Sequence, residues 1–220
     1  MKRYNEEIIE LLDPPAKKCY ISLCRKSNNI YNKITLINEL NKKVIKGLPL
    51  IQENDKCEIL NNIYEVSEYF YSCMEYVGQI IRSVCKISIK EELKDGFNSV
   101  LNDINKFKDG KKQSIAYSNI AIRNYISQSE EWYNIIHCIR TEETHYGTGE
   151  IQVNDKDSKW LIYKNTLRNG KGNIKEIHLS LNELSQIYFS YCMFVDQLDT
   201  MIKYIYNLNE SSKGSSTSHH

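Results

Sequence analysis

The residues best suited to chemistry in this chain are an arginine and a histidine near position 140. Arg140 and His145 have four residues between them, in the stretch IIHCIRTEETHYGTGE. An imidazole has an unperturbed pKa of about 6.5, so a histidine exchanges protons near neutral pH. A guanidinium stays charged and presents a planar fork of donors that fits a phosphate. Together they suit the metal-independent cleavage of a phosphodiester, with His145 as acid/base and Arg140 as phosphate clamp.

The spacing of the pair permits convergence of the two side chains and does not require it. Five positions along a straight helix turn by about 500°, which leaves Arg140 and His145 roughly 140° apart around the axis. Gly147 and Gly149 follow directly, so we expect the helix to end near His145, where a terminal turn brings the imidazole toward Arg140. The alternative is an ordinary helix C-terminus, with both side chains near exposed carbonyls and the helix dipole.

Most of the chain has the periodicity of amphipathic helices. The expected helices span residues 4–12, a segment from after Pro15 to the KGLP of 46–49, 55–86, 93–107, 113–145 with a break at Ser127 or Ser129, and 182–207. Asn54 and Asp55 can cap the third of these helices. Either Asn182, or Ser180 with Glu183, can cap the last.

Between residues 150 and 180 the pattern changes to short alternating runs, in EIQVNDKDSKWLIYKNT and IKEIHLSL, which predict two or three antiparallel strands. The predicted fold is therefore all-α, an antiparallel helix bundle with a small antiparallel β insertion between its last two long helices. We expect one domain over residues 1–210. Residues 211–220, SSKGSSTSHH, have no apolar side chain and look like a disordered tail or the remnant of an affinity tag.

An arginine and a histidine so spaced, late in a helical chain and after the helix EEWYNIIHCIR, resemble the HEPN superfamily. The R-x4-6-H motif of that family falls on Arg140 and His145. The resemblance implies an endoribonuclease of a microbial defence or toxin–antitoxin system that needs no metal or other cofactor. It also implies a homodimer in which two motifs meet in a composite cleft, and an antitoxin protein as a partner. Attack by the neighbouring 2′-hydroxyl would leave 2′,3′-cyclic phosphates and exclude DNA as a substrate.

A basic segment follows the motif. Residues 159–175 contain no acid and interleave aromatic with basic side chains: Lys159, Trp160, Tyr163, Lys164, Arg168, Lys171 and Lys175. Such a hairpin can grip the phosphates of a single RNA strand and stack its bases. The alternative is an ordinary hairpin with lysines on its exposed face and Trp160 in the core.

The composition of the chain argues against several classes of protein. Lys and Arg total 29 against 28 for Asp and Glu, so no field over the whole surface gathers nucleic acid. No apolar run reaches the length of about 18 residues that a membrane span requires, and the start lacks the pattern of a signal peptide, so we expect a cytoplasmic protein without membrane contact. The seven cysteines include no C-x-x-C pair and are expected to be buried reduced thiols rather than metal ligands.

A second class of function stays open, a non-catalytic helical module that binds RNA, a nucleotide or a partner protein. Thr141 follows Arg140, where many HEPN members have a polar residue that is most often Asn. Glu142 and Glu143 lie inside the motif, where two carboxylates would repel a phosphate, although we expect both to face solvent. His137 is expected to be packed or solvated rather than a ligand.

Overall fold

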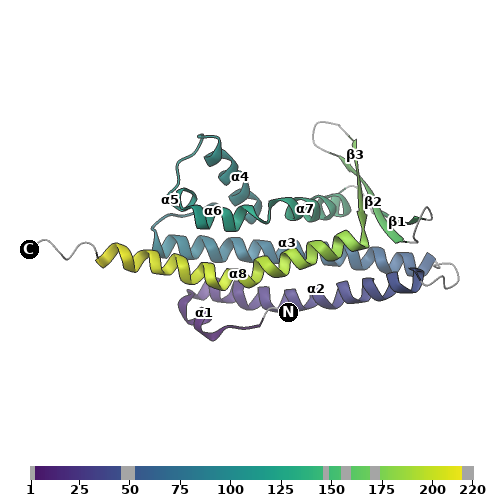
Figure 1. Cartoon of the computed structure of the whole chain (residues 1–220), viewed down its shortest axis with the longest axis horizontal. Coiled ribbons are helices and arrows are strands. Elements are labelled where there is room, and N and C mark those ends of the chain that lie inside the picture. Colours follow the sequence, from purple (N-terminus) through teal and green to yellow (C-terminus); the bar gives the residue numbers. More distant parts are fainter. Residues whose placement is uncertain (1–2, 46–52, 146–148, 155–159, 169–173, 215–220) are drawn as a thin grey trace, which may run out of the picture. The chain divides into compact units, whose positions relative to one another are not determined.

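The computed structural model describes residues 3–45, 53–145, 149–154, 160–168 and 174–214. The fold is an all-α antiparallel helix bundle with a three-stranded antiparallel sheet between α7 and α8, which confirms the predicted class (Figure 1). The elements are α1 (Glu6–Leu11), α2 (Pro14–Ile45), α3 (Glu53–Ser88), α4 (Phe97–Lys108), α5 (Ile115–Ser118), α6 (Ile120–Ser127), α7 (Glu130–His145), β1 (Glu150–Asn154), β2 (Trp160–Arg168), β3 (Ile174–Ser180) and α8 (Leu181–Gly214).

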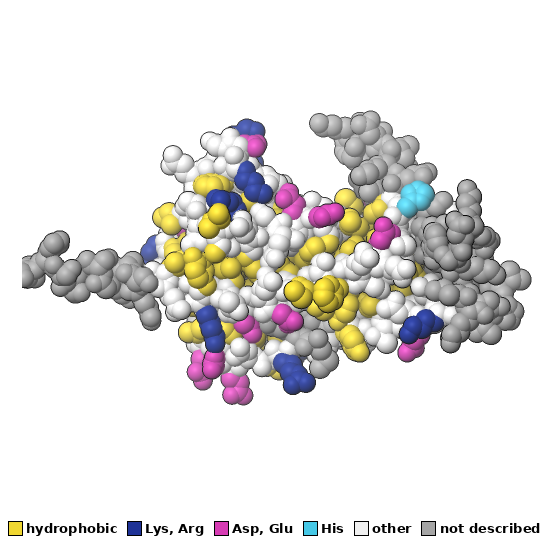
Figure 2. Space-filling view, in the orientation of Figure 1, with side chains coloured by type: hydrophobic (Ala, Val, Ile, Leu, Met, Phe, Trp, Pro, Cys, Tyr) yellow, Lys and Arg dark blue, Asp and Glu magenta, His cyan; other side chains and the backbone are white. Residues whose placement is uncertain are grey.

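Charged side chains of both signs are scattered over the described surface on the face that Figure 2 shows. This agrees with the near balance of 29 basic and 28 acidic residues in the sequence. No helix in the described ranges has an apolar stretch long enough to cross a lipid bilayer.

The chain divides into two compact units, and α2, α3, α7 and α8 contribute residues to both. The first unit comprises Met1–Lys26, Ser72–Glu131 and Tyr191–His220, and the second comprises Ser27–Tyr71 and Trp132–Ser190. Arg140 and the whole sheet belong to the second unit. A single domain over residues 1–210 stays a prediction.

The core of the first unit centres on Phe194 of α8. Its ring stacks on that of Tyr125 of α6, with centroids 4.5 Å apart, and meets Phe97 of α4 edge-on at 6.1 Å. The Tyr125 hydroxyl donates to the Phe194 carbonyl at 3.1 Å, which satisfies a buried polar group. A Cβ at Gly78 of α3 would come within 3.2 Å of the Phe97 nitrogen, so glycine allows α4 to approach α3 closely.

Two glycines set the limits of α4. Gly96 has a φ of 82°, a left-handed conformation that ends the preceding loop, so α4 begins at Phe97 and the predicted start at Leu93 is wrong. The predicted end near residue 107 is confirmed, because α4 ends at Lys108, Asp109 is the C-cap and Gly110 has a φ of 71°.

Polar side chains begin the next two helices. The Ser114 hydroxyl accepts from the backbone N–H of Tyr117 at 3.0 Å and caps α5. Asn119 caps α6, accepting at its Oδ1 from two backbone N–H groups, and this break was not predicted. The predicted break near Ser127 or Ser129 is confirmed, because α6 ends at Ser127 and α7 begins at Glu130.

The ends of the long helices follow local signals in part. Asp13 accepts from the backbone N–H of Ala16 at 3.0 Å, and Pro14 occupies the first position of α2, where its missing N–H costs nothing. The predicted capping of α3 by Asn54 and Asp55 is wrong, because α3 begins at Glu53 and both residues lie in its first turn.

The start of α8 shows the reciprocal capping box that the sequence predicts as one of two alternatives. The backbone N–H of Ser180 donates to Glu183 Oε2 at 2.7 Å, and the backbone N–H of Glu183 donates to Ser180 Oγ at 3.1 Å. Asn182 is the second residue of the helix and does not cap it.

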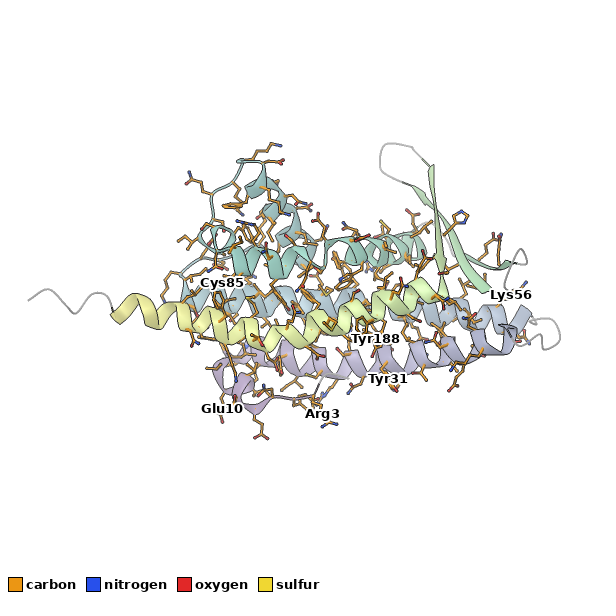
Figure 3. The ribbon with its side chains drawn as sticks, viewed as in Figure 1. Arg3, Glu10, Tyr31, Lys56, Cys85 and Tyr188 are labelled. Carbon is orange, nitrogen blue, oxygen red and sulfur yellow. The ribbon has the colours of Figure 1, made fainter. Side chains whose placement is uncertain are left out.

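The second unit places the sheet against its own apolar core. Tyr163 on the central strand β2 is fully buried and pairs in register with Ile151 of β1 and Leu179 of β3, both also buried. The rings of Tyr31 of α2 and Tyr188 of α8 lie 6.5 Å apart (Figure 3). The strand pairings join the three strands of the sheet, and the contact of the two tyrosine rings joins α2 to α8.

The cysteines are only partly buried. Cys24, Cys73 and Cys85 are buried as predicted, whereas Cys57 is exposed and the prediction is wrong there. Burial raises the pKa of Cys85 to about 12, and nearby Glu91 adds to the effect, so this thiol is protonated at neutral pH.

Candidate functional site around Arg140

The helix α7 fixes the position of Arg140. It runs without a break from Glu130 to His145, and its buried side chains include Trp132, Tyr133, Ile136 and Ile139. Arg140 directly follows the last of these, so its side chain leaves the helix at the margin of the buried face. The guanidinium therefore meets side chains of α3, Glu68 and Tyr71.

Two side chains of α3 hold the guanidinium of Arg140. Its Nε donates to Glu68 Oε1 at 3.1 Å, and its Cζ lies 4.6 Å from the centroid of the Tyr71 ring. Glu68 and Tyr71 are three positions apart on α3, so both face the same neighbour. The Arg140 side chain is still 27% exposed and that of Glu68 is 30% exposed, so neither side chain is fully enclosed.

A second imidazole belongs to this cluster. The ring of His137 lies 5.7 Å from the ring of Tyr71 on α3 and 5.7 Å from that of Tyr133 on its own helix. Burial lowers the pKa of His137 below its ordinary value of 6.5, and the positive charge of Arg140 lowers it further. We expected the side chain of His137 to be either packed or solvated. The packed alternative is confirmed, because the side chain is half-buried and contacts the rings of Tyr71 and Tyr133.

The acidic residues inside the motif do not all face solvent. Glu142 is only 4% exposed, so the expectation that it faces solvent is wrong. The side chains of Glu143 and Thr144 lie outside the described part of the structure. Since Glu142 is two positions beyond Arg140, it points about 200° away around the helix axis, toward the opposite side.

His145 is the last residue of α7, which confirms the predicted end of the helix. Its backbone is helical, so its Cβ lies roughly 140° around the axis from that of Arg140. The imidazole itself lies outside the described side chains. Convergence of Arg140 and His145 on one phosphate stays a prediction.

The basic hairpin residues fall on β2 or on its flanking turns. Trp160, Lys164 and Arg168 lie in β2, at positions out of step with the buried Tyr163, while Lys159 and Lys171 lie outside the described residues. Nothing in the described side chains tests their RNA contacts. Tyr163 is fully buried, so it packs in the core and its suggested role in base stacking is wrong.

A hollow elsewhere in the molecule has the wrong charge for RNA. It has a volume of about 690 Å³ and belongs to the first unit, and its lining residues are Arg3, Tyr4, Asn5, Glu6, Glu7, Asp196 and Asp199. Four of these seven residues are acidic, so the hollow repels a phosphate backbone. The described residues also include no group of three or more His, Cys, Asp or Glu side chains arranged to hold a metal ion.

The sequence did not predict the partners of Arg140. Glu68 and Tyr71 lie in a stretch of α3 rich in aromatic residues, and such a stretch is more typical of a core or a dimer surface than of a site. Which face of α3 meets α7 depends on the packing of the whole unit. The i, i+3 spacing of His137 and Arg140 was the available signal, because it puts both on one side of a helix.

Comparisons of this chain with models of known protein families, with curated proteins and with solved structures found no match. Functional inference therefore depends on the cluster of Glu68, Tyr71, His137 and Arg140, and on the motif that Arg140 shares with His145.

Proposed function

We propose that this protein is a metal-independent endoribonuclease of HEPN type, in which Arg140 holds the scissile phosphate and His145 exchanges protons with the reacting oxygens. The observation that carries the proposal is that two side chains of α3 hold the guanidinium of Arg140 in place. Its guanidinium is oriented by Glu68 and Tyr71, yet it keeps 27% of its side-chain surface exposed, one turn before the end of α7.

The support matters because clamping a transition state requires a positioned donor. A guanidinium fixed before the substrate binds needs little reorganisation as negative charge develops on the phosphate. The Tyr71 ring restricts the plane of the guanidinium, and the Glu68 carboxylate restricts its direction. A free arginine would lose rotamer entropy on binding, which this arrangement avoids.

The reaction follows from these two groups. His145 takes the proton of the ribose 2′-hydroxyl, or returns one to the 5′-oxygen that leaves. Arg140 neutralises charge on the non-bridging phosphate oxygens. The products are a 2′,3′-cyclic phosphate and a 5′-hydroxyl, and DNA lacks the nucleophile.

The wider setting is part of the same proposal. A homodimer would bring two Arg140 sites together, and the segment with Lys159, Trp160, Lys164, Arg168 and Lys171 would bind the RNA strand beside them. The protein would act in the cytoplasm of a microbe, in a defence or toxin–antitoxin system, with an antitoxin protein that silences it.

The test is cleavage of structured and single-stranded RNA by purified protein in EDTA. We expect the wild type to cleave and His145→Asn to be slower by at least about 100-fold, the usual effect of losing a general acid or base. Gln197→Asn is the control, because Gln197 is an exposed polar residue of α8 in the first unit. Equal rates for wild type and His145→Asn would remove His145 from the mechanism.

The second candidate is a non-catalytic helical module that binds RNA, a nucleotide or a partner protein. It is favoured by the ion pair of Arg140 with Glu68, which is also what an arginine with a purely structural role would form. This candidate predicts no RNA cleavage by the wild type, together with a lower melting temperature for Arg140→Gln.

A further inference from the structure

The structure pairs Arg140 with a second histidine on the same side of α7. His137 precedes Arg140 by three positions, which places the two Cβ atoms about 60° apart around the axis and about 4.5 Å apart along it. His145 is roughly 140° from Arg140 by the same reasoning. Of the two helix positions, that of His137 is therefore the closer in direction to the position of Arg140.

Tyr71 of α3 connects the two side chains. The centroid of its ring lies 4.6 Å from Cζ of Arg140 and 5.7 Å from the ring centroid of His137. The ring centroid of Tyr133, on the same helix, also lies 5.7 Å from that of His137. The imidazole is near both tyrosine rings and is only half-buried.

We propose that His137 takes the proton of the ribose 2′-hydroxyl while Arg140 holds the phosphate. This assignment rests on the ribonuclease function proposed above. It leaves to His145 the return of a proton to the departing oxygen.

The step balances in protons and bonds. As the 2′-oxygen bonds to phosphorus, its proton moves to a ring nitrogen of His137. The bond from phosphorus to the 5′-oxygen breaks, and that oxygen receives a proton from His145 in its protonated form. Proton exchange with water then restores both histidines, and no electrons are transferred.

The surroundings of His137 keep it in the form that accepts a proton. The charged or titratable groups that face it are Arg140 and Tyr133 of α7 and Tyr71 of α3, with Glu68 of α3 behind the guanidinium. Burial and the charge of Arg140 lower the pKa of His137 below 6.5. The rate should therefore rise with pH through a value below 6.5 as His137 loses its proton, and it should fall again at higher pH as His145 loses the proton that it gives to the leaving oxygen.

The substitution that separates chemistry from packing is His137→Phe, because it keeps a ring between Tyr71 and Tyr133 and removes the nitrogens. We expect kcat/KM on RNA in EDTA to fall at least about 100-fold and the acidic limb of its pH profile to disappear. Free imidazole should partly restore His137→Ala, which packing alone would not produce. Tyr204→Phe is the control and should cleave like wild type, because it also removes a polar atom from a ring, here one that is 37% exposed on α8 in the first unit.

Two results would overturn the assignment, and they differ. If His137→Phe keeps the wild-type rate and pH profile while His145→Asn is inactive, His137 only packs and the proposed ribonuclease stands. If the wild type itself does not cleave RNA, the ribonuclease proposal fails and the role of His137 fails with it.

Discussion

Two ion-pair clusters, one in each unit, differ in how far their central charged side chain is buried. In the first unit Asp103 of α4 is 1% exposed and is paired with Lys112 and with Lys94, the latter at 3.1 Å. In the second unit Arg140 and Glu68 are both about a third exposed or less, at 27% and 30%. The charge of Asp103 is enclosed and neutralised by lysines, whereas that of Arg140 is supported from α3 and open to solvent.

Under the proposed function, the difference separates a cluster that stabilises the fold from a cluster that acts on RNA. Removing a buried carboxylate that lies between two cations lowers the free energy of unfolding strongly, because the cations lose their partner and the site stays desolvated. A partly exposed arginine pair contributes at most about 1 kcal/mol to stability. We therefore expect substitutions in the Asp103 cluster to change unfolding, and those in the Arg140 cluster to change activity.

The largest expected effect is that of Arg140→Gln on catalysis. We expect kcat/KM on RNA to fall by about 1000-fold, because a fixed donor to the transition state is lost. Arg140→Lys should lose about 100-fold, because the charge stays and the planar fork does not. Arg82→Gln is the matched control, because Arg82 also pairs with a glutamate and its side chain is 30% exposed. Full activity of Arg140→Lys would contradict the clamp.

Of these variants, Asp103→Asn should destabilise the folded protein the most. We expect it to lower the free energy of unfolding by about 2 kcal/mol at pH 7, less than for a fully enclosed pair because Lys94 is 54% exposed. Urea denaturation followed by circular dichroism measures this. The folded variant should cleave RNA at the wild-type rate, and a selective loss of activity would break the separation between the two clusters.

The Asp103 cluster should also give the protein an acid-sensitive stability. Burial alone would raise the pKa of Asp103, but hydrogen bonds and charge from Lys112 and Lys94 outweigh it and hold the pKa below 3.8. Because the folded pKa is lowered, the stabilisation is present above the unfolded value and is lost as pH falls through the folded one. As pH falls below the ordinary Asp pKa of about 3.9, the wild type should lose more stability than Asp103→Asn. Parallel curves for the two proteins would contradict this.

Glu68→Gln should have the smallest effect. We expect kcat to fall about tenfold, because the guanidinium loses the carboxylate that directs it. KM should not rise, because a negative charge that competes with the phosphate is also gone. The free energy of unfolding should change by less than about 1 kcal/mol. Faster cleavage by this variant would show that Glu68 inhibits Arg140 rather than positioning it.

Local signals in the sequence predicted most of the fold. Ser180 and Glu183 cap α8 as one of the two predicted alternatives, and the break before Glu130 follows serines at 127 and 129. These interactions span three residues or fewer, so the sequence contains them fully. The break at Asn119 was missed because the flanking isoleucines continue a helical pattern, although both Ile115 and Ile120 are exposed.

The site could be predicted only in part. The end of α7 at His145 follows from the glycines after it, whereas the contact of Arg140 with Glu68 joins residues 72 positions apart. Burial of Glu142 depends on which side of α7 meets the core near its end, and a run of polar residues gives no apolar pattern from which to predict that.

The measurement that tests the central claim most directly is mass spectrometry of the RNA ends formed in EDTA by wild type and by Arg140→Gln. We predict 2′,3′-cyclic phosphate and 5′-hydroxyl ends from the wild type, and none above background from Arg140→Gln on the same timescale. Ends of another chemistry, or the same cyclic ends at equal rates from both proteins, would contradict a phosphate clamp at Arg140.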